Sequence, residues 1–177
     1  SGLDVFVASS GWGAGAWSSG AFGASEALSS SNQLRLWSID NFGEDIVACP
    51  RAGGLFYWDN SDGLTTRSKA FSALTNSNLA PTKGFQVIVS DVDRHVLVLG
   101  ADPISGTSRS GSIDPLLIAW CDQENILEWN PLSTNTAGSL RCSAGSEIIG
   151  GLRARQETLI WTDAALYSLQ FIGPMVY

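Results

Sequence analysis

The side chains that could do acid–base or nucleophilic chemistry are few and scattered in this sequence. His95 is the only histidine, and it stands at a predicted strand start with no G-x-S-x-G motif or other nucleophile signature nearby. Carboxylate pairs occur at Glu44-Asp45 and at Asp91 and Asp93, in predicted turns, where solvated carboxylates are far commoner than a glycosidase pair. These residues form no catalytic pattern, and we predict that the chain is not an enzyme.

The cysteines do not suggest a metal or cofactor site either. Cys49, Cys121 and Cys142 are widely spaced and include no C-x-x-C pair. With a single histidine in the chain, this spacing argues against a zinc site and predicts buried free thiols. The glycine-rich stretch 11–15 lacks the strand-to-helix context of a dinucleotide site. We therefore predict no catalytic residue, no metal and no cofactor.

One unit, an apolar strand that ends in Trp and then Asp, occurs three times, in residues 55–59, 116–122 and 159–163. The Trp ring is predicted to fill the wedge between neighbouring units, and the Asp to accept backbone N–H bonds in the following turn. Calcium at these turns is left open, although no EF-hand type loop occurs. The predicted structural repeat residues are Trp58, Asp59, Trp120, Asp122, Trp161 and Asp163.

A recurrent strand–turn–strand unit cannot bury its own apolar face, so it must stack on copies of itself. Short strands recur from residue 33 onward, interrupted by an excursion over 59–84 with at most one helical turn and by a polar surface loop over 101–113. We predict an all-β fold of propeller-type blades built from short antiparallel strands. Residues 33–177 would supply about three blades of a larger propeller, because a closed one has four to eight.

Residues 1–32 are predicted to be a Gly/Ser/Trp-rich loop segment after a first strand. Trp12, Trp17 and Phe22 follow one another at a spacing of five, which matches neither a helix nor a strand. Large aromatic side chains at intervals indicate a loop that docks, either on its own domain or on a neighbouring subunit. Trp12, Trp17 and Phe22 are therefore candidate interface residues.

Composition limits the class of partner. The 177 residues are 44% hydrophobic and 15% charged, with a net charge of −7. This charge argues against a protein that grips nucleic acid through its phosphates, but it permits a wall past which DNA slides. No apolar run reaches the ~20 residues of a membrane span. Both chain ends are expected to be cuts within a longer polypeptide.

Several runs resemble tail proteins of short-tailed, podovirus-type bacteriophages, the hub or nozzle (tail tubular, DNA-stabilising) class. The resemblance covers nearly the whole chain after residue 30 and the glycine–tryptophan tract before it, although members of that class are several times longer. The runs that carry it include LRLWSIDNFGED (34–45), GGLFYWD (53–59), VSDVDRHV (89–96), GSEIIGG (145–151), RARQE (153–157) and IWTD (160–163).

The resemblance implies a structural virion protein that contains a β-propeller. It implies a homo-oligomeric ring, commonly a hexamer, that retains and conducts the genome and contacts other tail or adaptor proteins. Passing double-stranded DNA would be a partner without sequence-specific binding, and the protein would be assembled in the host cytoplasm into the virion tail. The alternative is a carbohydrate-binding module that recognises a host-surface glycan through exposed Trp. A glycan-cleaving tail enzyme is a weaker idea, since no acid pair is identified.

Overall fold

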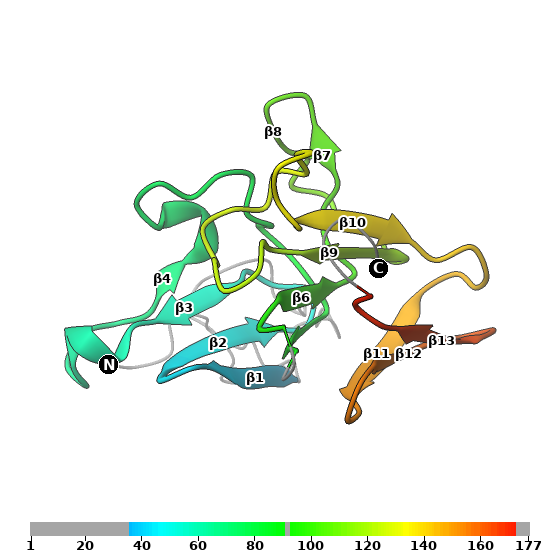
Figure 1. The fold of residues 1–177 in the computed structure, drawn as a ribbon, viewed down its shortest axis with the longest axis horizontal. Helices are drawn as coiled ribbons and strands as arrows, with labels where there is room; N and C mark the ends of the chain where they lie inside the picture. Colours follow the sequence, from blue (N-terminus) through cyan, green and yellow to red (C-terminus); the bar gives the residue numbers. More distant parts are fainter. Residues whose placement is uncertain (1–35, 91–92, 173–177) are drawn as a thin grey trace, which may run out of the picture. The chain divides into compact units, whose positions relative to one another are not determined.

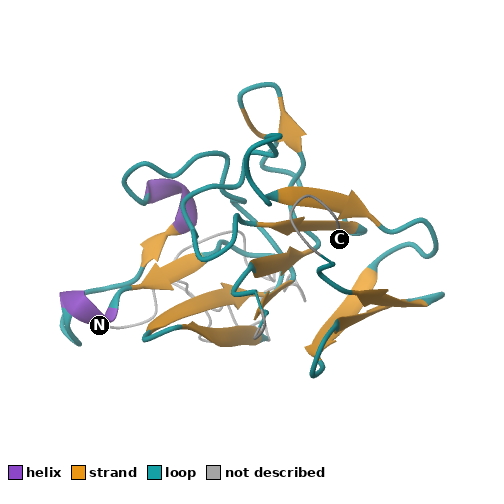
Figure 2. Ribbon diagram, in the orientation of Figure 1, coloured by secondary structure: helices purple, strands orange, loops and turns teal. Residues whose placement is uncertain are grey.

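Short apolar stretches separated by turns fold into antiparallel strands throughout the part of the chain that the computed structural model describes, residues 36–90 and 93–172 (Figure 1). These strands form three small sheets and one separate hairpin. Figure 2 shows helix in this part only as short turns, which are 3-10 turns at Asn60–Asp62 and Phe71–Ala73. No helix of the described residues is long and apolar enough to cross a bilayer. The predicted all-β class is confirmed.

The first sheet is a meander of consecutive strands. Its strands are β1 (Trp37–Phe42), β2 (Asp45–Pro50), β3 (Phe56–Trp58) and β4 (Lys69–Ala70), in that spatial order. The β1–β2 turn contains Gly43 at a φ of +72°, a conformation that glycine adopts without a steric penalty. This places the turn at residues 43–44, and Asn41 and Phe42 belong to β1.

The second sheet is apolar on both faces. Its strands are β5 (Gln86–Val89), β6 (Val96–Leu99), β9 (Leu117–Trp120) and β10 (Gly138–Arg141), in the order β10-β9-β6-β5. Every residue of β6 and β9 is buried. A sheet with one solvated face alternates buried and exposed positions, so this continuous burial indicates packing on both sides.

The third sheet consists of β11 (Ile148–Arg153), β12 (Thr158–Thr162) and β13 (Leu166–Leu169). Burial alternates along β12: Ile160 is buried, whereas Trp161 is exposed. The third sheet therefore has one inner face and one outer face.

Two separate hydrophobic cores show that the second sheet lies between the other two. On one side, Val87 and Val98 pack with Val47 and Phe71 of the first sheet and its following turn. On the other side, Ile88, Leu97 and Leu99 pack with Ile148 and Ile160 of the third sheet. The three sheets are thus layered face to face in sequence order.

A short hairpin, β7 (Ile104–Ser105) and β8 (Ser108–Arg109), is inserted between β6 and β9 (Figure 1). We predicted residues 101–113 to be a polar surface loop, and the hairpin tip is exposed. The prediction is wrong at the base of the loop, where Ala101 and Asp102 are fully buried. Closure of the sheets into a ring is not seen within residues 36–90 and 93–172, so the propeller stays a prediction.

Candidate functional site: carboxylate turns and the junction of three edge strands

Two of the repeat aspartates each accept two hydrogen bonds from a single Ser or Thr residue. Asp122 Oδ1 accepts hydrogen bonds from the Thr136 backbone N at 2.8 Å and from Thr136 Oγ1 at 2.7 Å. Asp163 accepts from the Ser146 backbone N at 2.7 Å and from Ser146 Oγ at 2.5 Å. We call a carboxylate that accepts both the N–H and the O–H of one Ser or Thr a carboxylate clamp. These two clamps join segments 14 and 17 residues apart.

Asp59 forms the same clamp within a single turn. Its Oδ1 accepts from the Ser61 backbone N at 2.8 Å and from Ser61 Oγ at 2.6 Å, at the start of the 3-10 turn Asn60–Asp62. Because the partner is only two residues away, this clamp shapes a local turn and joins no distant segments.

Asp102 forms a fourth clamp, which the sequence analysis did not predict. Asp102 accepts from the Thr82 backbone N at 2.9 Å, from Thr82 Oγ1 at 2.5 Å, and from the backbone N of Lys83 and Gly111 at 3.3 and 3.2 Å. It follows the apolar strand β6 by three positions, as Asp122 follows β9 by two, but no Trp precedes it. An Asp shortly after a buried strand is the signal that would have found it.

In three of the clamps, hydrogen bonds lower the pKa of the carboxylate. Hydrogen bonds from Ser61 lower the pKa of Asp59, and hydrogen bonds from Ser146 lower the pKa of Asp163. Burial acts to raise the pKa of Asp122, but the hydrogen bonds from Thr136 outweigh it and leave this pKa below its usual range. Within the described residues, no three His, Cys, Asp or Glu side chains are grouped as they would be around a metal ion.

The three repeat tryptophans lie in different environments. Trp120 is 7% exposed in the core between the second and third sheets, and its Nε1 donates to Thr136 O at 2.8 Å. Trp58 is half-buried on the outer side of β3, where its Nε1 donates to Thr66 O. Trp161 is 38% exposed on the outer face of the third sheet. Of these three rings, only Trp120 fills a space between two described sheets.

His95 is linked to the Asp122 clamp. It is fully buried, and its Nε2 lies 2.9 Å from Thr136 Oγ1. Thr136 Oγ1 donates to Asp122 and also accepts from the Gln123 backbone N at 2.9 Å, so we assign the proton of this contact to His95 Nε2. Burial lowers the pKa of His95 against the charges of Asp93 and Asp122. The contacts with His95, Asp122 and Gln123 use the full hydrogen-bonding capacity of the Thr136 hydroxyl. They hold the turn that follows β9 in place.

The cysteines are buried free thiols, as predicted. Burial raises the pKa of Cys49 and of Cys121 to about 12, so both stay protonated at neutral pH. A thiol is a weak nucleophile and metal ligand compared with its thiolate. These side chains act as small apolar core residues.

The edge strands β1, β5 and β11, each the first of its sheet, meet at one junction. The outward N–H groups of β5 are bound by side chains of β1, because Val87 N donates to Ser38 Oγ at 2.9 Å and Val89 N to Asp40 Oδ2 at 2.8 Å. From β11, Arg153 Nη1 donates to Val89 O at 2.9 Å and lies 3.4 Å from Asp40 Oδ2. Side chains thus satisfy an edge that would otherwise be open.

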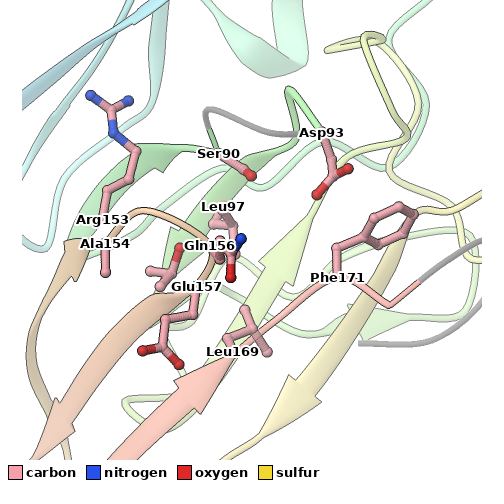
Figure 3. Close-up of a pocket in the computed structure, with 10 residues that line it drawn as sticks. Ser90, Asp93, Leu97, Arg153, Ala154, Gln156, Glu157, Leu169 and Phe171 are labelled. Carbon is pink, nitrogen blue, oxygen red and sulfur yellow. The ribbon is translucent and has the colours of Figure 1, made fainter.

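A small cavity lies beside this junction, and Figure 3 shows Ser90, Asp93 and Phe171 around it. The guanidinium of Arg153, another lining residue, is turned toward the strands of the first sheet, where it meets Asp40. The cavity has a volume of about 20 Å³, which is room for one water molecule. Sites for small-molecule ligands are typically about 300–1,000 Å³. This cavity is therefore a water-sized gap between turns.

The fold and these contacts define an all-β protein in which many polar side chains of the described residues bind turns and strand edges. Comparisons of the chain with protein-family models, curated proteins and solved structures found no match. The candidate interface residues Trp12, Trp17 and Phe22 lie outside the described residues, as does the whole of the predicted segment 1–32.

Proposed function

We propose that this chain is a structural, non-catalytic virion protein of a short phage tail, part of a hub or nozzle ring around the DNA channel that retains and conducts the genome. Its sheets would be blades of a β-propeller. The observation that carries the proposal is the face-to-face stack of three small meander sheets whose first strands, β1, β5 and β11, meet at one junction. Small sheets arranged radially around an axis are the defining feature of a propeller.

The chemistry of the described side chains supports a scaffold. The clamp carboxylates Asp59, Asp102, Asp122 and Asp163 are occupied by hydrogen bonds from the chain itself. The resemblance to hub and nozzle proteins of short-tailed phages supplies the tail position, and the net charge of −7 suits a wall that DNA passes without sticking.

Loss of the gene from the phage that encodes the chain tests this function. Particles assembled without the protein should package DNA but lose it from the head, and expression of the intact gene in trans should restore retention. DNA content per purified head, measured by quantitative PCR after nuclease treatment, is the readout. Particles that keep and eject their DNA normally without the protein would contradict the proposal.

Contacts to neighbouring subunits or to adaptor proteins are assigned to two segments, the aromatic tract 9–31 and the hairpin loop 101–113. Truncation of residues 9–31 in the full-length protein should abolish ring assembly observed by electron microscopy. A matched control replaces only Ser18, Ser19 and Ser25 by Ala and leaves Trp12, Trp17 and Phe22 in place. Unchanged assembly after truncation would remove that tract from the interface.

Glycan binding is the competing function. Sugar binding would use Trp12 and Trp17, and both residues lie outside the described part of the chain. We therefore propose the ring function in preference to glycan binding. A glycan array followed by calorimetric titration separates the two functions. Measurable sugar affinity that disappears in Trp12→Ala or Trp17→Ala would favour the binding module.

A further inference from the structure

The segment that follows β13 packs an aromatic ring on the only histidine of the chain. Phe171 comes two residues after Leu169, the last residue of β13, and its ring centroid lies 4.9 Å from that of His95. His95 directly precedes β6, a central strand of the second sheet, and none of its surface is exposed. We call residues 170–172 the cover segment. Its contact with His95 joins the end of the third sheet to the second sheet.

One ring nitrogen of His95 is held by the Asp122 clamp. His95 Nε2 donates to Thr136 Oγ1 at 2.9 Å, and this hydroxyl in turn donates to Asp122. An imidazolium keeps its N–H on Nε2, so protonation of His95 leaves this hydrogen bond in place. The structural response to protonation is therefore expected at the Phe171 contact and not at the clamp.

A positive charge on His95 is poorly solvated while Phe171 is docked. An aromatic ring attracts a cation only modestly, and this attraction is much smaller than the hydration that a fully buried cation gives up. Phe171 also borders the water-sized cavity, together with Asp93 (Figure 3). Movement of Phe171 away from His95 would let water reach the charged ring.

The charged groups around the ring do not remove this cost. Asp93 and Asp122 favour a charged His95, but burial outweighs both and lowers the pKa of His95 below its ordinary 6.5. The cover segment contains no charged residue. The other charged residues that flank the ring or line the cavity beside Phe171 already have partners, since Arg94 pairs with Glu124, Arg153 with Asp40, and Glu157 accepts from Ser168.

We propose that His95 and Phe171 form an acid-sensitive latch between the second and third sheets, in which protonation of His95 releases the cover segment and deprotonation lets it dock again. The latch goes beyond the proposed function and does not depend on a phage role. The released state exposes His95 to water and binds the proton more readily than the docked state. Docking should therefore be strongest above about pH 6.5 and weaken as the pH falls below that value.

Nuclear magnetic resonance of the His95 ring tests the latch in the 177-residue chain. Its ring signals are unambiguous, because the chain has no other histidine. At about pH 7.5, a nuclear Overhauser effect should connect the ring protons of His95 and Phe171. This contact should fade toward about pH 5.5 as the imidazole titrates, while circular dichroism shows that the β-sheets remain folded. The exchange of the His95 Cε1 proton for deuterium reports access of water to the ring.

Substitutions in the cover segment separate the latch from a general loss of structure. Phe171→Ala should raise the pKa of His95 toward 6.5 and speed the Cε1 proton exchange at about pH 7.5 by about tenfold or more. Phe171→Leu keeps an apolar side chain over the ring and should lie closer to the wild type in both measurements. The matched control is Ile172→Ala, which removes a neighbour that is 68% exposed and should change neither quantity.

Three results would overturn the latch. The first is a His95–Phe171 contact that is equally strong before and after His95 titrates. The second is a folded Phe171→Ala or Phe171→Leu protein in which His95 has the same pKa and exchange rate as in the Ile172→Ala control. The third is a contact that disappears only when circular dichroism shows unfolding of the whole chain.

Discussion

At the residue scale, the carboxylate clamp is the recurring device of this chain. Asp102 and Asp122 each accept the N–H and the O–H of one threonine, and Asp163 does the same with a serine. An ionised carboxylate has only acceptor sites, so it is suited to collect donors that a turn leaves without partners. Buried donors without an acceptor are costly, so the effect of removing a clamp depends on its burial.

Asp102→Ala should be strongly destabilising. Asp102 is fully buried and accepts four hydrogen bonds, so its removal leaves the donors of Thr82, Lys83 and Gly111 short of an acceptor. We expect a loss of about 3 kcal/mol or more in the free energy of unfolding, measured by urea titration. The control Asp59→Ala removes a clamp in an exposed turn and should shift the urea midpoint little. Equal effects of the two substitutions would refute this ranking.

His95 should make stability depend on pH. Burial lowers its pKa below the ordinary 6.5, so the unfolded chain binds the proton more readily than the folded chain. The contribution is complete above about pH 6.5 and is lost as the pH falls toward the folded pKa, with a slope of up to about 1.4 kcal/mol per pH unit. The lowered pKa values of Asp59, Asp122 and Asp163 affect stability only below pH 3.8, which is outside the range in which His95 titrates.

Urea midpoints at about pH 7.5, 6.5 and 5.5 measure this effect. His95→Gln keeps an N–H donor for Thr136 but does not titrate, so its stability should be flat over the same range. A wild-type protein whose stability is equally flat would contradict the assignment.

At the element scale, close approach of strands decides which positions tolerate a side chain. In β10, Gly138 lies under the Trp120 ring, and a Cβ built on it would come within 2.4 Å of Trp120 Cζ2. In β11, a Cβ on Gly150 would meet only Gln86 Oε1, at 3.4 Å. The β9–β10 pairing therefore depends on the absence of a side chain at one position.

Gly138→Ala should destabilise the fold by about 1–3 kcal/mol, because the methyl group overpacks the core around Trp120. Gly150→Ala is the matched control and should change stability by less than about 1 kcal/mol. Thermal unfolding followed by tryptophan fluorescence measures both. A Gly138→Ala protein as stable as the wild type would show that Trp120 can move aside at little cost.

At the scale of the whole molecule, the charge of −7 should prevent stable DNA binding. Fluorescence anisotropy of a labelled duplex at about 50 mM salt should not change on titration with the chain, because phosphate contacts by Lys and Arg dominate affinity at low salt. The same chain with an added C-terminal oligolysine tag should bind and confirm the sensitivity of the assay. If the untagged chain binds the duplex and this affinity falls steeply with salt, the proposal of a channel wall that does not bind DNA is contradicted.

Local patterns explain what could be predicted for this chain. Period-two alternation and turn residues predict short strands, and an Asp directly after an apolar strand predicts a turn carboxylate such as Asp122. Both signals act over a few residues, so they are visible without a tertiary structure. The all-β class and its short antiparallel strands follow from them, and the wide spacing of the cysteines predicts the buried free thiols.

Contacts between distant residues explain what could not be predicted. The β7–β8 insertion separates β6 from its partner β9, His95 meets Thr136 from 41 residues away, and Arg153 reaches Asp40 across 113. The sequence by itself therefore determined the kind of element and the turn chemistry, since these depend on neighbours along the chain. Only the tertiary structure decided which sheet each strand joins and that Asp102 and His95 are buried. Each of these is set by packing between segments that the sequence order does not relate.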